Sequence, residues 1–222
     1  MRQHAHAGMS LYGPTGSRKY LNAAERRRFI KAARRAPFDV QLFCLVLSLT
    51  GGRISEILAL TPAAIDLDSG AANITTLKRR KPGIVRQAPL PRGVLGELNH
   101  VFKIRRSQHD PGSAYRRIWK WSRTTAWRRV KEVMAAAGIS GTPAMPKGLR
   151  HGFGVNAFQS LVPPHLVQRC MGHASLKSTA IYGDAMGRKS AHSRQGCGPD
   201  QINEAGFSHP ATTSNANDDA HP

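Results

Sequence analysis

Residues 172–182 read Gly-His-Ala-Ser-Leu-Lys-Ser-Thr-Ala-Ile-Tyr, which places a tyrosine nine residues after the histidine of a Gly-His turn. Either residue alone is typical of ordinary structure, a turn histidine or a half-buried tyrosine on a helix. Earlier segments supply arginines and lysines in a definite order. The spacing therefore becomes informative only together with those segments.

Two earlier segments each place an arginine near the start of an expected helix. Residues 50–56, Thr-Gly-Gly-Arg-Ile-Ser-Glu, put Arg53 directly after a glycine break. Residues 147–151, Lys-Gly-Leu-Arg-His, put Arg150 at the opening of a later helix. Between them, residues 78–83 form the strongly basic tip of an expected β-hairpin. The chain thus offers an arginine, a hairpin lysine, a second arginine, a histidine and a tyrosine, in that order.

These residue types suit the breakage of a DNA phosphodiester without a metal ion. The attacked phosphate gains negative charge that fixed cations must neutralise, and arginine keeps its charge while gripping two oxygens. A nucleophile must attack, and an acid must protonate the departing sugar oxygen. A metal could do part of this work. The chain has only 13 Asp and Glu residues and no paired-carboxylate motif, which favours a route without metal or cofactor.

The ordered set resembles the catalytic domain of the tyrosine recombinase (phage integrase) family. That family carries an arginine in a Gly-x-Arg-x-x-Glu setting, a lysine on a β-hairpin, a His-x-x-Arg pair, a Gly-His pair and a tyrosine nine residues beyond that histidine. The resemblance covers roughly residues 20–186, and each piece is weak alone, while the ordered set is specific. The matching positions are Arg53 with Glu56, Lys78 or Lys81, Lys147 with Arg150, His173, and Tyr182.

The resemblance implies a mechanism for breaking and rejoining DNA. Tyr182 would attack the scissile phosphate, form a 3′-phosphotyrosine and free a 5′-hydroxyl. Arg53 and Arg150 would hold the non-bridging oxygens, and His173 would hydrogen-bond the phosphate. The hairpin lysine would protonate the leaving oxygen. Family members act on double-stranded DNA as tetramers, and whether this chain forms such a homo-oligomer stays open.

The identity of the hairpin lysine has two answers. When the position of the lysine along the hairpin is counted from the turn at Gly70, Lys78 is favoured. When it is counted backward from Pro89, Lys81 is favoured. We prefer Lys78, because it follows directly on the first strand. The alternative is that both lysines contact phosphates as simple charges.

Lys147 departs from the family, which usually has histidine at that position. A lysine can donate to a phosphate oxygen, but it must lose its proton before it can act as a base. We therefore expect Lys147 to be a phosphate ligand. His151, next to Arg150, is expected only to cap a helix or to pack.

The net charge independently indicates a polyanionic partner. With 33 Lys and Arg against 13 Asp and Glu, the formal charge is +20, and nucleic acid suits this better than an acidic membrane surface. The longest apolar run, residues 42–49, is too short to span a bilayer. Three scattered cysteines fit neither a zinc site nor a disulfide framework. We expect a cytoplasmic protein that needs no membrane.

Hydrophobic periodicity and turn residues predict a mainly α-helical domain with a small antiparallel β-sheet, in keeping with the DNA breaking-rejoining enzyme fold that the resemblance implies. Pro89 places the second strand at an edge. We expect a flexible tail over residues 1–20, the catalytic domain over 21–186 and a disordered tail over 187–222. Helices are expected over about residues 22–36, 40–49, 54–60, 94–106, 125–137, 148–161, 164–171 and 175–185, and strands over 71–77 and 84–90.

The basic and aromatic segment 115–131 is the expected DNA-binding surface. Charge of one sign with little Asp or Glu favours a surface that faces phosphates over an ordinary solvated one. The helix over residues 125–137 is our candidate for the major-groove element. The expected DNA contacts are Arg79, Arg80, Arg123, Thr125, Arg128, Arg129 and Lys131.

Two departures from the family motivate other interpretations. Family members carry an N-terminal helical domain that clamps the DNA and a C-terminal segment that docks on a neighbouring subunit, and neither pattern is visible here. We therefore expect a truncated recombinase. The rivals are a type IB topoisomerase-like enzyme, which shares the chemistry, and a non-catalytic DNA-binding remnant. The target site, and the choice among integration, excision and resolution, stay open.

Overall fold

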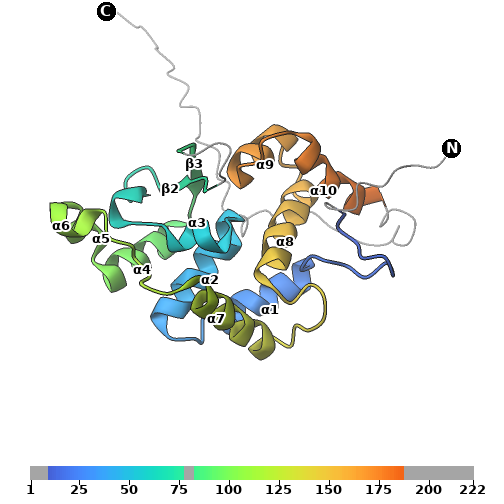
Figure 1. Ribbon diagram of the computed structural model, residues 1–222, viewed down its shortest axis with the longest axis horizontal. Coiled ribbons are helices and arrows are strands. Elements are labelled where there is room, and N and C mark those ends of the chain that lie inside the picture. Colours follow the sequence, from blue (N-terminus) through green and yellow to red (C-terminus); the bar gives the residue numbers. More distant parts are fainter. Residues whose placement is uncertain (1–9, 78–82, 188–222) are drawn as a thin grey trace, which may run out of the picture.

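The computed structural model describes residues 10–77 and 83–187. Most of these residues form helices, and a small β-sheet lies to one side of them (Figure 1). The mainly helical fold with a small antiparallel sheet is the one that the sequence predicts. The hairpin residues Lys78, Arg79, Arg80 and Lys81 fall between the two described ranges, so the choice of hairpin lysine stays a prediction.

The described part of the chain has helices from α1 to α10, one 3-10 helix and three strands. None of its helices has the length and apolar character needed to cross a membrane. The helices are α1 (Ala23–Ala33), α2 (Phe38–Thr50), α3 (Ile54–Leu58), η1 (Pro62–Ala64), α4 (Arg92–Phe102), α5 (Ile104–Gln108), α6 (Pro111–Ala114), α7 (Arg123–Ala136), α8 (Pro146–Gln159), α9 (Pro164–Met171) and α10 (Lys177–Gly187). The strands are β1 (Ile65–Asp66), β2 (Ala71–Thr75) and β3 (Val85–Pro89).

The first two helices form for different reasons. The side chain of Asn22 accepts from the backbone N–H of Glu25, while the Glu25 carboxylate accepts from that of Asn22, which is the capping box that the sequence predicts for α1. Helix α2 is instead buried along nearly all its length and forms the centre of the main core. Because α2 is apolar around most of its circumference, the other helices can pack on several of its sides.

Two of the four aromatic side chains in segment 115–131, Trp119 and Trp121, belong to the core, whereas Tyr115 and Trp127 are exposed. Trp119 is buried, its indole N–H donates to the backbone oxygen of Asp39 at 2.9 Å, and its ring packs edge-on against Phe43. Trp121 also packs against Phe43. Burial of these large apolar rings stabilises the core, while the DNA contacts expected of the basic residues in the segment stay a prediction.

The sheet has the order β1-β2-β3 and is antiparallel throughout. Ala71 pairs with Pro89, so β3 lies at the edge, as the proline predicts. Strand β1 was not predicted, because two residues are too few to show an alternation. Helix α9 lies against β3, and Arg86 of β3 lies next to Gly172 at the end of α9.

The segment 94–114 differs most from the prediction. The expected helix 94–106 is two helices, α4 and α5, because Lys103 between them takes a left-handed conformation with φ 53° and ends α4. Between residues 108 and 114, where the sequence predicts no helix, lies the short helix α6, which begins at Pro111 after the capping side chain of Asp110.

Residues 10–20 differ from the loose tail that we expect there. Leu11 and Tyr20 are buried in a second apolar cluster together with Phe153 and Tyr182. The backbone N–H of Lys19 donates to the Leu11 oxygen at 2.8 Å, which folds the segment back on itself. Its glycines and serines suggested a loose tail, but its apolar side chains bury enough surface to order it. This segment therefore packs against the helices that carry the site.

Candidate active site

Four residues of the predicted constellation lie around the place where α8 and α10 pack together. Arg53 caps α3, Arg150 lies in the second turn of α8, His173 follows α9, and Tyr182 lies within α10. The positive charges of Arg53 and Arg150 both act on the pKa of Tyr182. The rings of His173 and Tyr182 stack, with centroids 6.0 Å apart and planes 18° apart. Residues far apart in the sequence thus share one site.

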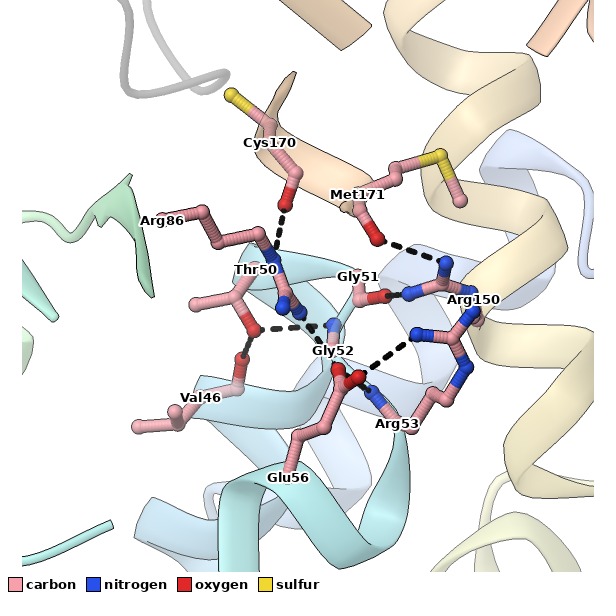
Figure 2. A network of polar contacts seen from close by, with 10 residues as sticks. All are labelled: Val46, Thr50, Gly51, Gly52, Arg53, Glu56, Arg86, Arg150, Cys170 and Met171. Carbon is pink, nitrogen blue, oxygen red and sulfur yellow. Dashed lines mark hydrogen bonds and ion pairs between the residues drawn. The ribbon is translucent and has the colours of Figure 1, made fainter. Parts of the chain in front are cut away.

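Arg150 is buried between the C-terminal ends of two helices. Its Nη1 donates to the backbone oxygen of Gly51 at 2.6 Å and its Nη2 to that of Met171 at 2.8 Å (Figure 2). Gly51 and Gly172 take the left-handed conformation that ends α2 and α9. The negative ends of both helix dipoles stabilise the buried cation. Burial, and then the charge of Arg53, lower the pKa of Arg150 to about 10, so it stays charged at neutral pH.

Glu56 orients Arg53. Its Oε1 accepts from Nη1 of Arg53 at 2.7 Å, and its Oε2 accepts from the backbone N–H of Arg53 at 3.0 Å, which also caps α3. Oε2 accepts a further bond, from Nη2 of Arg86 at 2.6 Å. Burial acts to raise the pKa of Glu56, but Arg86 and the bonds from Arg53 outweigh it and the pKa is lowered. Glu56 is therefore a carboxylate that holds two arginines (Figure 2).

Arg86 is a site residue that the sequence analysis missed. It lies on β3, is buried, and donates from Nε to the backbone oxygen of Cys170 at 2.8 Å. It therefore joins the hairpin to α9 and, through Glu56, to Arg53. The signal in the sequence was the alternation of β3, which puts Arg86 on the same inward face as Ala88. A charged residue on an inward face requires a buried partner.

The ring of Tyr182 is seated on α8 and is 1% exposed. Gly154 makes room for it, since a Cβ at that position would lie 2.5 Å from Cε2 of the tyrosine. Phe158, one turn further along α8, packs against the ring at a centroid distance of 6.2 Å. The hydroxyl lies 3.2 Å from Nδ1 of His151. Burial raises the pKa of Tyr182 to about 12, although Arg150 and Arg53 favour its ionised form.

His173 is held on both sides. Nδ1 of its ring is in hydrogen-bond contact with Oγ1 of the buried Thr179 at 2.8 Å. Its backbone oxygen accepts from Nε2 of Gln168 at 3.2 Å. These contacts fix the ring that stacks on Tyr182.

Lys147 has an exposed side chain in the first turn of α8, and its positive charge acts on His151 one turn later. His151 and Gly154 are the other two residues that sequence reasoning missed as parts of the site. Both residues lie close to Arg150 along α8, which could have drawn attention to them. The sequence alone could not show which face of α8 packs against α10 and Tyr182.

The expected DNA contacts on α7 have unequal surroundings. Arg123 and Arg128 are exposed and make no ion pair with any described residue. Arg129 pairs with Glu132 at 3.2 Å. Nζ of Lys131 donates to the backbone oxygen of Ala144 at 2.7 Å, so this lysine braces the loop after α7. Thr125 donates its backbone N–H to the capping Ser122 side chain, which gives it a structural role as well. The structure brings none of these residues to Tyr182.

Comparison with known proteins extends these observations. Residues 19–187 match the family model described as the phage integrase family. The chain is 31% identical over 168 residues to the tyrosine recombinase XerA of Pyrococcus furiosus, across 74% of this chain and 56% of that relative. It is 30% identical over 143 residues to XerD of Shewanella oneidensis, across 62% of this chain and 46% of XerD. The chain thus spans about half the length of the curated relatives it matches.

Solved structures share the fold. The crystal structure of XerA recombinase superposes with a TM-score of 0.63 at 23% identity, across 79% of this chain and 65% of that one. The XerH site-specific recombinase in a post-cleavage complex with its palindromic difH substrate gives a TM-score of 0.65 at 20% identity, across 78% of this chain and 52% of that one. With the family model matching most of its length and the recombinase fold around its four converging site residues, the chain belongs to the phage integrase family.

Proposed function

We propose that this chain is the catalytic part of a tyrosine site-specific DNA recombinase, which cuts and rejoins double-stranded DNA through a 3′-phosphotyrosyl intermediate. The observation that carries this proposal is the grouping around the buried Tyr182 of the His173 ring, which stacks on it, and of Arg53 and Arg150, whose charges act on it. Two fixed cations beside a nucleophile suit a reaction in which negative charge grows on a phosphate. Membership of the phage integrase family supports the same chemistry.

Each residue has a role in the proposed step. The Tyr182 oxygen attacks phosphorus, an O–P bond forms, and the bond from phosphorus to the 5′ oxygen breaks. The hairpin lysine, Lys78 or Lys81, gives the leaving oxygen its proton. Arg53 and Arg150 hold the non-bridging oxygens, since each guanidinium has five donors and the contacts described above use only some of them. Rejoining is the same step in reverse, so neither metal nor ATP is required.

The tyrosine must be uncovered before it can react. Tyr182 is 1% exposed, so some of the side chains that cover it have to move when DNA binds. Arg53 is the more accessible arginine, with about a third of its side chain exposed (32%). We propose that Arg53 meets the scissile phosphate first, and that Arg150 and Tyr182 engage it as the covering side chains shift.

The proposed partner is double-stranded DNA, with Arg79, Arg80, Arg123 and Arg128 as phosphate contacts. A net charge of +20 supports this. The XerH relative was crystallised with its difH substrate, and a comparable assembly of several copies on DNA is proposed here. The proposed layout is a catalytic domain over residues 21–186 with the packed segment 10–20 as its N-terminal extension, in a protein of the cytoplasm.

A randomised substrate allows a test before the target sequence has been identified. The protein is incubated with a library of nicked duplexes whose core is randomised, the mixture is denatured in detergent, and DNA that remains attached to protein is recovered. We expect adducts with the natural chain and none with Tyr182→Phe. Tyr115→Phe is the matched control, because Tyr115 is highly exposed and lies outside the site. Absence of adducts from the natural chain, despite DNA binding, would instead support a non-catalytic DNA-binding protein.

A further inference from the structure

Two basic residues of α8, one helical turn apart, differ in what they can do for the tyrosine. Lys147 is exposed in the first turn, and His151 lies beneath it on the inner side, against Tyr182. A protonated lysine has three donors and no acceptor, whereas a neutral imidazole has one acceptor nitrogen. A nucleophile that must lose a proton needs the acceptor.

The acceptor nitrogen of His151 lies next to the Tyr182 hydroxyl oxygen, which is the proposed reacting atom. Nδ1 of His151 lies 3.2 Å from the Tyr182 hydroxyl oxygen, within the range for proton transfer along a hydrogen bond. The two rings are tilted by 56°, with centroids 5.9 Å apart. Gly154 seats the tyrosine ring on the same helix that carries His151. A single rigid element therefore fixes both partners of the contact.

The surroundings keep this histidine neutral. Burial, then Lys147 and Arg150 on its own helix and Lys19 on the N-terminal segment, lower the pKa of His151 to about 4. At neutral pH the ring carries one proton, and the tautomer with that proton on Nε2 leaves the Nδ1 lone pair facing the hydroxyl. His173, the other histidine beside Tyr182, has its Nδ1 engaged with Thr179.

We propose that His151 accepts the phenolic proton of Tyr182 during DNA cleavage. This inference rests on the proposed function and adds a catalytic residue to it. As the O–P bond forms, the O–H bond of Tyr182 breaks and its proton passes to Nδ1 of His151. The bond from phosphorus to the 5′ oxygen breaks with its electron pair, and that oxygen takes a proton from the hairpin lysine. In rejoining, His151 returns its proton to the tyrosine.

The proton transfer becomes favourable only with DNA in place. In the free protein the phenol is a weak acid and His151 a weak base, since burial raises the pKa of Tyr182 and lowers that of His151. A bound phosphate brings negative charge next to the imidazole, which raises the pKa of His151. The phenolic oxygen also loses its affinity for the proton as it bonds to phosphorus. This coupling restricts activation of the nucleophile to the DNA complex.

The test measures single-turnover adduct formation at several pH values on a duplex recovered from the randomised library. Sulfur replaces the bridging 5′ oxygen of that duplex, so the leaving group needs no acid. The dependence of the rate on pH then reflects only the deprotonation of Tyr182. The natural chain should give a nearly level rate between about pH 6 and 9. His151→Asn keeps a polar atom at the place of Nδ1 but cannot take the proton. We expect it to react at least about 100-fold more slowly at neutral pH.

The pH profile separates chemistry from folding. Without its acceptor, Tyr182 must ionise to the solvent, so the rate of His151→Asn should rise about tenfold per pH unit. His165→Asn on the exposed side of α9 is the control and should match the natural chain. An unchanged rate and a level profile in His151→Asn would overturn the proposal. A natural chain whose own rate rises tenfold per unit would also overturn it, even if the variant fails to fold. A natural chain that forms no adduct would instead refute the proposed function.

Discussion

The Tyr182 ring lies directly over the backbone of Gly154, so close that a single Cβ at that glycine would approach Cε2 of the tyrosine to 2.5 Å. Helix α8 thus provides both Arg150 and the surface on which the Tyr182 ring packs. The position of Tyr182 depends on the absence of a side chain at Gly154 as well as on the contacts that the tyrosine makes.

Gly154→Ala should therefore displace the tyrosine while leaving DNA binding intact. We expect the rate of adduct formation to fall by about 100-fold, because a shift of about 1 Å at a reacting atom is costly, with little change in DNA affinity. Gly96→Ala in α4 is the control, since nothing lies within 4 Å of a Cβ there. It should keep full activity and stabilise the fold by about 0.5–1 kcal/mol. Equal rates for Gly154→Ala and the natural chain would show that the tyrosine does not need this seat.

Arg86→Met should destabilise the protein strongly. The change leaves the Glu56 carboxylate buried with only Arg53 to balance it, and loss of one partner of a buried ion pair costs about 3–5 kcal/mol. Urea denaturation measures the free energy of unfolding. Arg105→Met removes an exposed partner of Asp68 and should change that free energy by less than about 1 kcal/mol. Similar losses from the two variants would mean that the buried network contributes no more than a surface pair.

Two kinds of basic residue on α7 should respond differently to substitution. Arg123→Ala and Arg128→Ala remove exposed charges, so each should weaken DNA binding and reduce the slope of log affinity against log salt by about 0.9. Lys131→Ala breaks a bond to the Ala144 oxygen and should act mainly on stability. Fluorescence anisotropy at several salt concentrations gives the slopes. Unchanged slopes for both arginine variants would place the DNA on another surface.

Arg53, Arg150, His173 and Tyr182 were predictable because their order and the final spacing of nine residues match the motifs of the tyrosine recombinase family. Tyr182 lies nine residues after His173, Arg53 directly follows a glycine break, and Arg150 lies near the start of a predicted helix, so short local patterns carried the information. Arg86, His151 and Gly154 were missed because their roles arise from contacts between elements. From the sequence, Arg86 resembles a surface residue, and its burial follows only from the contact of β3 with α9. Gly154 likewise resembles any helix glycine, and its role follows only from the packing of α10 on α8.

Misinterpretations of the fold have a similar origin. Trp119 lies among arginines and lysines in the sequence, and only the packing of α2 shows that its ring is buried against Phe43. Leu11 and Tyr20 lie in a glycine-rich stretch whose composition suggests a loose tail, and their burial depends on Phe153 in a distant helix. Local composition predicted the elements but could not show which faces would be covered.

The most direct measurement identifies the amino acid that becomes linked to DNA. Adducts of the natural chain are digested with protease and nuclease, and mass spectrometry locates the residue that retains a nucleotide. The account predicts a nucleotide on Tyr182, in the segment that reads Gly-His-Ala-Ser-Leu-Lys-Ser-Thr-Ala-Ile-Tyr from residue 172, and no adduct from Tyr182→Phe. A nucleotide on any other residue, or an adduct that persists in Tyr182→Phe, would contradict it.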